Sequence, residues 1–195
     1  MRELILQMQM SVDGFVGAAG DHDWQVWGWG DHNRWDAALK RDFNAHFQSI
    51  DTILLSRKMV EEGYLSHWGH AAKRYPEDPF YAFAQRIIDV QKVVPSDKLQ
   101  ESRWERTVVT TGDLPREVGA LKAEEGGHIG VFGGAGLASA LIAAGLVDQF
   151  HFYVNPAALG AGTRIFDRAG FRKLSLLGSK AYECGIVVNR YASAA

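Results

Sequence analysis

The residues best suited to bind a ligand are two glycines, Gly133 and Gly134, which stand between the apolar run 129–132 and a helix-like pattern. Gly133 and Gly134 lack a Cβ, so the backbone there can adopt positive φ and come close to a ligand. The free N–H groups and the dipole of the following helix suit a phosphate or pyrophosphate. The segment is not G-x-G-x-x-G, so the Rossmann fingerprint is not met. A glycine turn that only joins a strand to a helix is the alternative interpretation.

A second candidate is the pair of cations Arg57 and Lys58, which directly follow another apolar run at the start of a helix pattern. Guanidinium and ammonium groups at such a position can pair with the phosphates of a nucleotide, and helix N–H groups add donors. An exposed helix start with solvated charges is the competing interpretation.

Two further candidates lie near the first apolar run. Asp13 precedes Gly14 in a tight turn, where its carboxylate could hydrogen-bond a substrate, although a turn-stabilising Asx side chain explains it equally well. Trp24 belongs to the Gly- and Trp-rich segment 20–32, which either offers aromatic faces to a flat heterocycle or packs as a flap on the core or on a partner subunit. The Asp-His-Asp run at 21–23 has no third ligand at a recognisable spacing, so no metal site is predicted.

Apolar periodicity predicts the elements that position these residues. Strands are expected at residues 4–10, 52–55, 92–94, 107–110, 128–132, 149–154, 173–177 and 185–191, and helices at 34–47, 58–66, 79–90, 115–125 and 137–144. One buried helix face is marked by the 3.6-residue spacing of Trp35, Leu39, Phe43, Phe47 and Ile50. Strands alternate with helices first and then follow one another, which predicts an α/β fold: a mixed, mostly parallel sheet with an antiparallel edge and helices on both faces.

The composition fits one globular domain over residues 1–195. Hydrophobic residues make up 47%, and the net charge of −2 gives no basic footprint for nucleic acid. No apolar run approaches the length of about 20 residues that spans a membrane, and no signal peptide is recognisable. The single cysteine, Cys184, cannot form an internal disulfide, which favours a cytoplasmic location.

Several segments, taken in order, resemble the dihydrofolate-reductase-like superfamily, and most closely the stand-alone relatives of the reductase domain of bifunctional riboflavin-biosynthesis proteins. Residues 10–16 are similar to the first strand and its S-x-D-G turn, and residues 51–58 to the D-T-x-L-x-G-R-x-T step. The other similar segments are residues 92–96, the glycine pair after Phe132, and the tail at 145–148, 155–162 and 164–166. The resemblance implies a dihydrofolate-reductase-like three-layer fold.

The resemblance also implies a site for NADPH. Its matched positions are Gln9, Val16 and Gly17 beside the nicotinamide, Arg57 and Lys58 at the phosphates, Ser96 near the adenosine ribose, Phe132 between the nicotinamide and substrate rings, and the turn of Gly133, Gly134, Ala135, Gly136 and Leu137. Phe132 is equally well explained as a core residue. Asp97 stands where relatives commonly carry a cation, so NADH is possible as the cofactor, although Lys98 could reach a 2′-phosphate.

Three functions are compatible with this resemblance. The first is an NAD(P)H-dependent oxidoreductase that transfers a hydride to a C=N or C=O of a small heterocyclic substrate, with Asp13 or water as the proton donor and Trp24 and Phe132 beside the substrate. The second is 5-amino-6-(5-phosphoribosylamino)uracil reductase of riboflavin biosynthesis, and the third is a non-catalytic nucleotide-binding module. We expect a homodimer that buries the late apolar strands 150–154 and 185–188, with no nucleic-acid or membrane partner.

Overall fold

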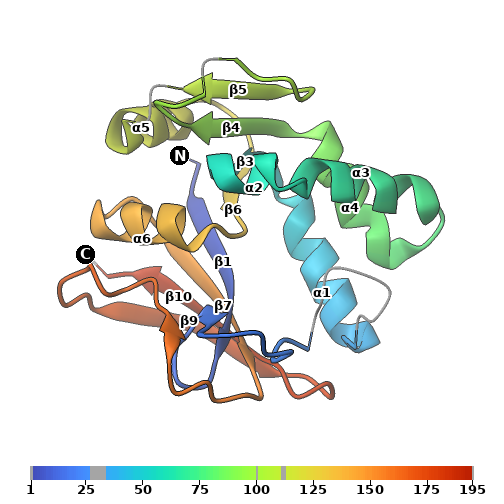
Figure 1. Cartoon of the computed structure of the whole chain (residues 1–195), viewed down its shortest axis with the longest axis vertical. Coiled ribbons are helices and arrows are strands. Elements are labelled where there is room, and N and C mark those ends of the chain that lie inside the picture. The colour runs from blue at the N-terminus through green and yellow to red at the C-terminus, as the bar shows by residue number, and fades with distance from the viewer. Residues whose placement is uncertain (1, 27–33, 100, 111–112, 195) are drawn as a thin grey trace.

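The computed structural model describes residues 2–26, 34–99, 101–110 and 113–194. Within these residues an eight-stranded sheet has the order β5-β4-β3-β6-β1-β7-β10-β9 (Figure 1). Its strands are β1 (Leu4–Ser11), β3 (Ile50–Leu54), β4 (Gln91–Pro95), β5 (Thr107–Thr110), β6 (His128–Val131), β7 (Gln149–Asn155), β9 (Leu174–Ala181) and β10 (Val187–Ser193). Neighbours from β5 to β7 pair in parallel, whereas β10 pairs antiparallel with both β7 and β9. The predicted mixed sheet with an antiparallel edge is confirmed.

Helices cover both faces of the sheet, as predicted. One side carries α1 (Ala37–Gln48), α3 (Tyr64–Arg74) and α4 (Ala82–Asp89), and the other carries α5 (Leu114–Ala123) and α6 (Ala135–Ala143) (Figure 1). Alternate residues of β1 supply the two cores, because successive side chains of a strand point to opposite faces. Ile5 packs in the cluster on the α1 side, and Leu4 and Leu6 pack in the cluster on the α6 side. None of the described helices is both long and apolar enough to cross a membrane.

The first helix is anchored by the apolar face that its spacing predicts. Leu39, Phe43 and Phe47 of α1 form this face and are at most 3% exposed, whereas Trp35 precedes the helix and Ile50 begins β3, and both are also buried. The carboxylate of Asp36 accepts a hydrogen bond from the Leu39 N–H at 2.9 Å and caps the helix, so regular structure begins at Ala37 rather than at residue 34.

Three local features differ from the prediction. Gly63 adopts a φ of 96° and divides the predicted helix 58–66 into α2 (Arg57–Glu61) and α3, because a left-handed residue ends a helix. The predicted helix 79–90 begins with a separate 3-10 turn, Pro79–Tyr81, before α4. A two-residue ribbon, β2 (Gly17–Ala18) with β8 (Gly162–Thr163), was not predicted, since it is too short to show periodicity.

The stability of the fold should fall in acid because of two histidines, the half-buried His46 on α1 and the buried His151 on β7, whose ring centroids lie 4.4 Å apart. Burial is the largest cause that lowers the pKa of His46 to about 4 and the pKa of His151 to about 3. In the unfolded chain both groups protonate near the ordinary histidine value of about 6.5. Between pH 6.5 and pH 4 the unfolded state therefore binds more protons than the folded state, and acid favours unfolding.

We expect the free energy of unfolding to decrease by several kcal/mol over that window, because each group contributes roughly 1.4 kcal/mol for each unit by which its folded-state pKa is lowered. Urea unfolding at a series of pH values measures this quantity. The variant His151→Gln should show a shallower pH dependence, and identical pH profiles for parent and variant would contradict the prediction.

Candidate cofactor site

A pocket of about 380 Å³ lies at the carboxyl ends of the parallel strands β3 and β4, beside α6. Its lining residues are Ser56, Arg57, Pro95, Ser96, Asp97, Leu114 and Leu137. Three of the predicted cofactor residues, Arg57, Ser96 and Leu137, therefore come from separate segments to one place. Open parallel sheets bind ligands at this edge, where loops and helix N-termini follow the strands.

The glycine turn packs against the segment that follows β3. Gly134 has a φ of 75° and precedes α6, and no side chain within the described ranges caps the first N–H groups of that helix. A Cβ on Gly134 would lie 2.7 Å from Ser56 Oγ, whereas a Cβ on Gly136 would meet no atom within 4 Å. The fold itself therefore requires glycine at 134, and Gly136 leaves open space in front of the helix.

The two cations of α2 have different environments. Arg57 lines the pocket with a side chain 39% exposed and forms an ion pair with Glu61, one turn later. Lys58 is not among the lining residues, and its side chain is 79% exposed, with Nζ 3.6 Å from Glu62 Oε1. The geometry supports Arg57 as a phosphate contact and favours the solvated-charge interpretation for Lys58.

The turn after β4 places a carboxylate, rather than an ammonium, in the pocket. Ser96 Oγ accepts hydrogen bonds from the N–H groups of Lys98 at 3.1 Å and Leu99 at 3.2 Å, and its own O–H donates to no residue within the described ranges. Asp97 lines the pocket, whereas Lys98 lines a neighbouring hollow with Glu61 and Trp104. The charge next to Ser96 is therefore negative.

Asp13 is held in a turn by the tail of the chain. Its carboxylate accepts hydrogen bonds from Ser11 Oγ at 2.6 Å, from Gly160 N–H at 2.7 Å and from Leu159 N–H at 3.0 Å. The bond from Ser11, followed by that from Gly160, lowers the pKa of Asp13 to about 2. A group ionised this strongly is a poor proton donor near neutral pH, so the structure favours the turn-stabilising role over the predicted catalytic one.

The predicted nicotinamide residues lie on β1 and shortly after it, and none of them lines the pocket beside Ser96. Val16 N–H donates to Thr163 O at 2.8 Å, and Gly17 pairs with Thr163 in the β2–β8 ribbon. Gln9 Oε1 accepts a hydrogen bond at 3.2 Å from Nδ2 of Asn155, a fully buried residue that the sequence reasoning did not select. Asn155 Oδ1 in turn accepts from Val26 N–H at 2.8 Å, which ties Gln9 to the Trp-rich segment.

The two predicted substrate residues, Phe132 and Trp24, do not line the pocket beside Ser96. Phe132 stacks on Phe47 of α1 with ring centroids 4.5 Å apart and packs against the core on that side, in agreement with its alternative interpretation. Trp24 is half-buried in a segment without regular structure. The rest of the Gly- and Trp-rich segment, from residue 27 to residue 32, lies outside the described residues.

Comparison with known proteins identifies one family. The profile of the RibD C-terminal domain matches residues 2–188. The uncharacterized protein YyaP of Bacillus subtilis (strain 168) is 26% identical over 188 residues, which cover 95% of this chain and 92% of that protein.

Solved structures agree on the fold. A putative riboflavin biosynthesis protein from Shewanella sp. PV-4 superposes with a TM-score of 0.69 at 17% identity, covering 99% of both chains. A diaminohydroxyphosphoribosylaminopyrimidine deaminase/5-amino-6-(5-phosphoribosylamino)uracil reductase from Thermotoga maritima gives a TM-score of 0.66 at 12% identity, covering 99% of this chain and 57% of that one. The predicted dihydrofolate-reductase-like fold is thereby confirmed.

Proposed function

Since the chain belongs to the RibD C-terminal domain family, we propose that it is an NAD(P)H-dependent reductase that transfers a hydride to a C=N or C=O group of a small heterocyclic substrate. One observation carries the proposal: Arg57, Ser96 and the first turn of α6 meet in a single pocket at the carboxyl edge of the sheet. This pocket offers a cation, a hydroxyl group and helix N–H groups, which are the partners that a dinucleotide needs.

The residues present fit such a cofactor. The open space in front of Gly136 admits a phosphate to the start of α6, and Arg57 adds a cation at the rim. The Ser96 hydroxyl can donate to a ribose oxygen, because its acceptor sites are used by its own turn. When bound, the nicotinamide supplies the hydride, and the chain binds and orients the two reactants. Because Asp13 is ionised within its turn, we assign the proton to water.

The test is a fluorescence and calorimetric titration with NADPH and NADH, followed by cofactor oxidation in the presence of heterocycles that carry a C=N or C=O group. Binding with turnover of at least one substrate supports the proposal. If neither nucleotide binds, the pocket is not a cofactor site and the proposal fails. Binding without turnover of any substrate would favour the non-catalytic nucleotide-binding module instead.

Family membership makes 5-amino-6-(5-phosphoribosylamino)uracil the first substrate to try. The Thermotoga maritima protein carries this reductase activity in its name, and its fold matches nearly the whole of this chain. Turnover of this compound would assign the chain to riboflavin biosynthesis, and turnover of other heterocycles alone would keep the broader reductase proposal.

We expect only a weak preference for NADPH over NADH, or the reverse preference, because Asp97 faces the pocket while Lys98 lies outside it. A carboxylate repels a 2′-phosphate but accepts hydrogen bonds from a free 2′-hydroxyl. Asp97→Arg should shift the ratio of the two dissociation constants toward NADPH by roughly 10- to 100-fold, which is about 1–3 kcal/mol. Lys98→Gln is the control and should leave the ratio unchanged. An unchanged ratio in Asp97→Arg would remove Asp97 from the site.

We propose that the expected homodimer uses a different surface from the one first predicted. Phe150 of β7 and Val188 of β10 are 1% and 8% exposed, so these two side chains are already buried within one subunit. Two exposed apolar side chains lie on the edge strand β9, where Leu176 and Leu177 are 61% and 50% exposed, and Phe171, shortly before this strand, is 96% exposed. An unpaired apolar edge strand favours association with a second copy. Light scattering at micromolar concentration should give a mass in solution of twice the 21.6 kDa of one chain. The variant Leu176→Lys should have a lower mass in solution than the parent. A parent protein with the mass of one chain would refute the dimer.

A further inference from the structure

A second polar pocket, of about 500 Å³, lies between α1 and the antiparallel part of the sheet. Three residues in register across β7, β10 and β9 form one row of its floor: His151, Arg190 and Gly178. Asp42 and His46 of α1 line the opposite wall. This pocket shares no lining residue with the one beside Ser96.

The charges in this pocket leave one cation unbalanced. The Asp42 carboxylate accepts hydrogen bonds from Lys180 Nζ and Tyr182 Oη, both at 2.6 Å, so the charges of Asp42 and Lys180 offset each other. The backbone of Arg190 is paired with β7 and β9, but its side chain forms no hydrogen bond or ion pair with any residue that the structure describes. Its guanidinium lies beside Gly178, where a Cβ would stand 3.1 Å from Nη2. A planar guanidinium exposed in this way can bind a carboxylate or phosphate through two parallel hydrogen bonds.

The imidazole rings of His46 and His151 could add hydrogen-bond donors, which would become charged when an anion binds. His46 Nε2 is buried without a hydrogen-bond partner, and His151 Nε2 lies 3.2 Å from Gln149 Oε1. Burial is the main cause that lowers the pKa of both rings, the charges of Arg190 and His128 lower both further, and His46 also lowers the pKa of His151. An anion beside Arg190 would cancel that repulsion and raise both pKa values, so the imidazoles would become charged donors to the same anion.

We propose that this pocket binds a small molecule through an anionic group, a carboxylate or a phosphate, which is held by Arg190 and by the imidazoles of His46 and His151. The volume of the pocket leaves room for more than the anionic group alone. Because binding brings protons onto the histidines, affinity should increase as the pH falls from 7 toward 5.5, provided that the anion itself stays ionised.

The experiment is an NMR titration of the whole protein that follows the imidazole C–H signals of His46 and His151, assigned with His→Gln variants. Phenyl phosphate, benzoate and phenol serve as probes, because they share a ring and differ in the charged group. Saturable shifts with phenyl phosphate or benzoate, and none with phenol, are expected. The tighter of the two anions identifies the preferred group. Affinity should be unchanged at saturating NADPH, which makes the result independent of the proposed reductase activity.

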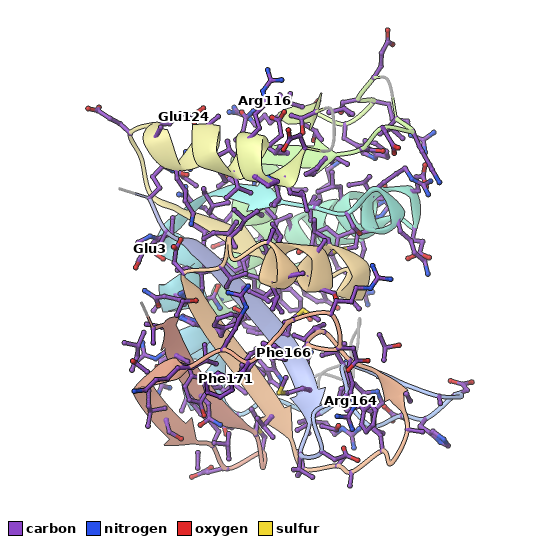
Figure 2. All side chains as sticks on the ribbon, turned by 90° about the vertical axis from the view of Figure 1, so that its left-hand side faces the viewer. Glu3, Arg116, Glu124, Arg164, Phe166 and Phe171 are labelled. Atoms are coloured by element: carbon purple, nitrogen blue, oxygen red, sulfur yellow. The ribbon has the colours of Figure 1, made fainter. Side chains whose placement is uncertain are left out.

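Arg190→Gln should weaken binding by at least about tenfold, because it removes the bidentate cation. Lys180→Gln should also weaken binding, because it leaves the charge of Asp42 unbalanced next to the ligand. Arg116→Gln is the matched control, since Figure 2 shows Arg116 on the outer surface of α5, far from β9 and β10. The proposal is overturned if no saturable shift occurs, including the case in which a second copy of the chain covers the pocket. It is also overturned if Arg190→Gln and Arg116→Gln bind alike.

Discussion

Gly136→Asp is expected to weaken cofactor binding by at least about 100-fold while making the folded protein slightly more stable. The two effects have opposite signs because a carboxylate in the first turn of α6 interacts favourably with the helix dipole, by about 0.3–1 kcal/mol, and repels an incoming phosphate. Two unit charges about 4 Å apart near a protein surface repel by about 4 kcal/mol. A 100-fold loss of affinity, about 2.7 kcal/mol, is therefore a conservative expectation.

The structure makes position 136 a better test than the preceding glycine. A side chain at Gly134 would strain a φ of 75° and collide with Ser56, so a change there damages the fold whether or not a ligand binds. No atom lies within 4 Å of a Cβ on Gly136. Gly119, in the helix α5, has equally open surroundings and gives the matched control Gly119→Asp.

Calorimetric titration with NADPH and thermal unfolding of the two variants would measure both effects. Only Gly136→Asp should lose cofactor affinity, and only this variant should gain stability from the helix dipole. If Gly136→Asp binds NADPH as tightly as the parent, the start of α6 is not the phosphate site. Equal losses in both variants would point to a general effect of added negative charge.

The fold could be predicted largely from the sequence, because helix spacing and apolar strand runs are both patterns of residues close together in the chain. The spacing of Trp35, Leu39 and Phe43 indicates a buried helix face, and short apolar runs such as residues 53–55 and 129–132 indicate buried parallel strands. The cofactor pocket could also be predicted in part. Each matched segment follows the carboxyl end of a strand, and parallel pairing brings those ends to one edge.

The remaining features depend on contacts between residues distant in the chain. Asp13 alone does not reveal that Leu159 and Gly160 will satisfy its carboxylate, so its two interpretations could not be separated beforehand. Asn155 lies in an ordinary strand, and its link to Gln9 spans 146 positions. Arg2 is the clearest example, because a cation near a chain end is usually solvated, whereas this one is 5% exposed.

Arg2 connects four segments of the fold. Its guanidinium donates to Gly127 O at 2.7 Å and Thr52 Oγ1 at 2.6 Å, forms an ion pair with Asp51, and reaches Glu124 Oε2 at 3.1 Å. Two of these partners, Asp51 and Thr52, lie within β3, Gly127 directly precedes β6, and Glu124 caps the end of α5. Figure 2 shows Glu124 at this end of α5, above Glu3 of the first strand segment. The network therefore fixes how the chain start, the central strands and α5 meet.

Arg2→Met is expected to lower the free energy of unfolding by about 3 kcal/mol, because it leaves buried acceptors without a donor. This is the lower end of the usual range for breaking a buried ion pair, since the side chain of Asp51 is 35% exposed and water can partly solvate it. The free energy of unfolding of Arg2→Lys should lie between those of the parent and of the Met variant, because an ammonium keeps the charge but cannot reproduce the planar set of donors.

Chemical denaturation of the three proteins, with the exposed control Arg116→Met, would measure these differences. The free energy of unfolding of the control should stay within about 0.5 kcal/mol of the parent value, as it does for most surface substitutions. A Met variant as stable as the control would mean that solvent replaces the guanidinium at little cost. A Lys variant as stable as the parent would show that charge alone, rather than the geometry of the five N–H donors, holds the four segments together. Either result would contradict the role assigned to Arg2.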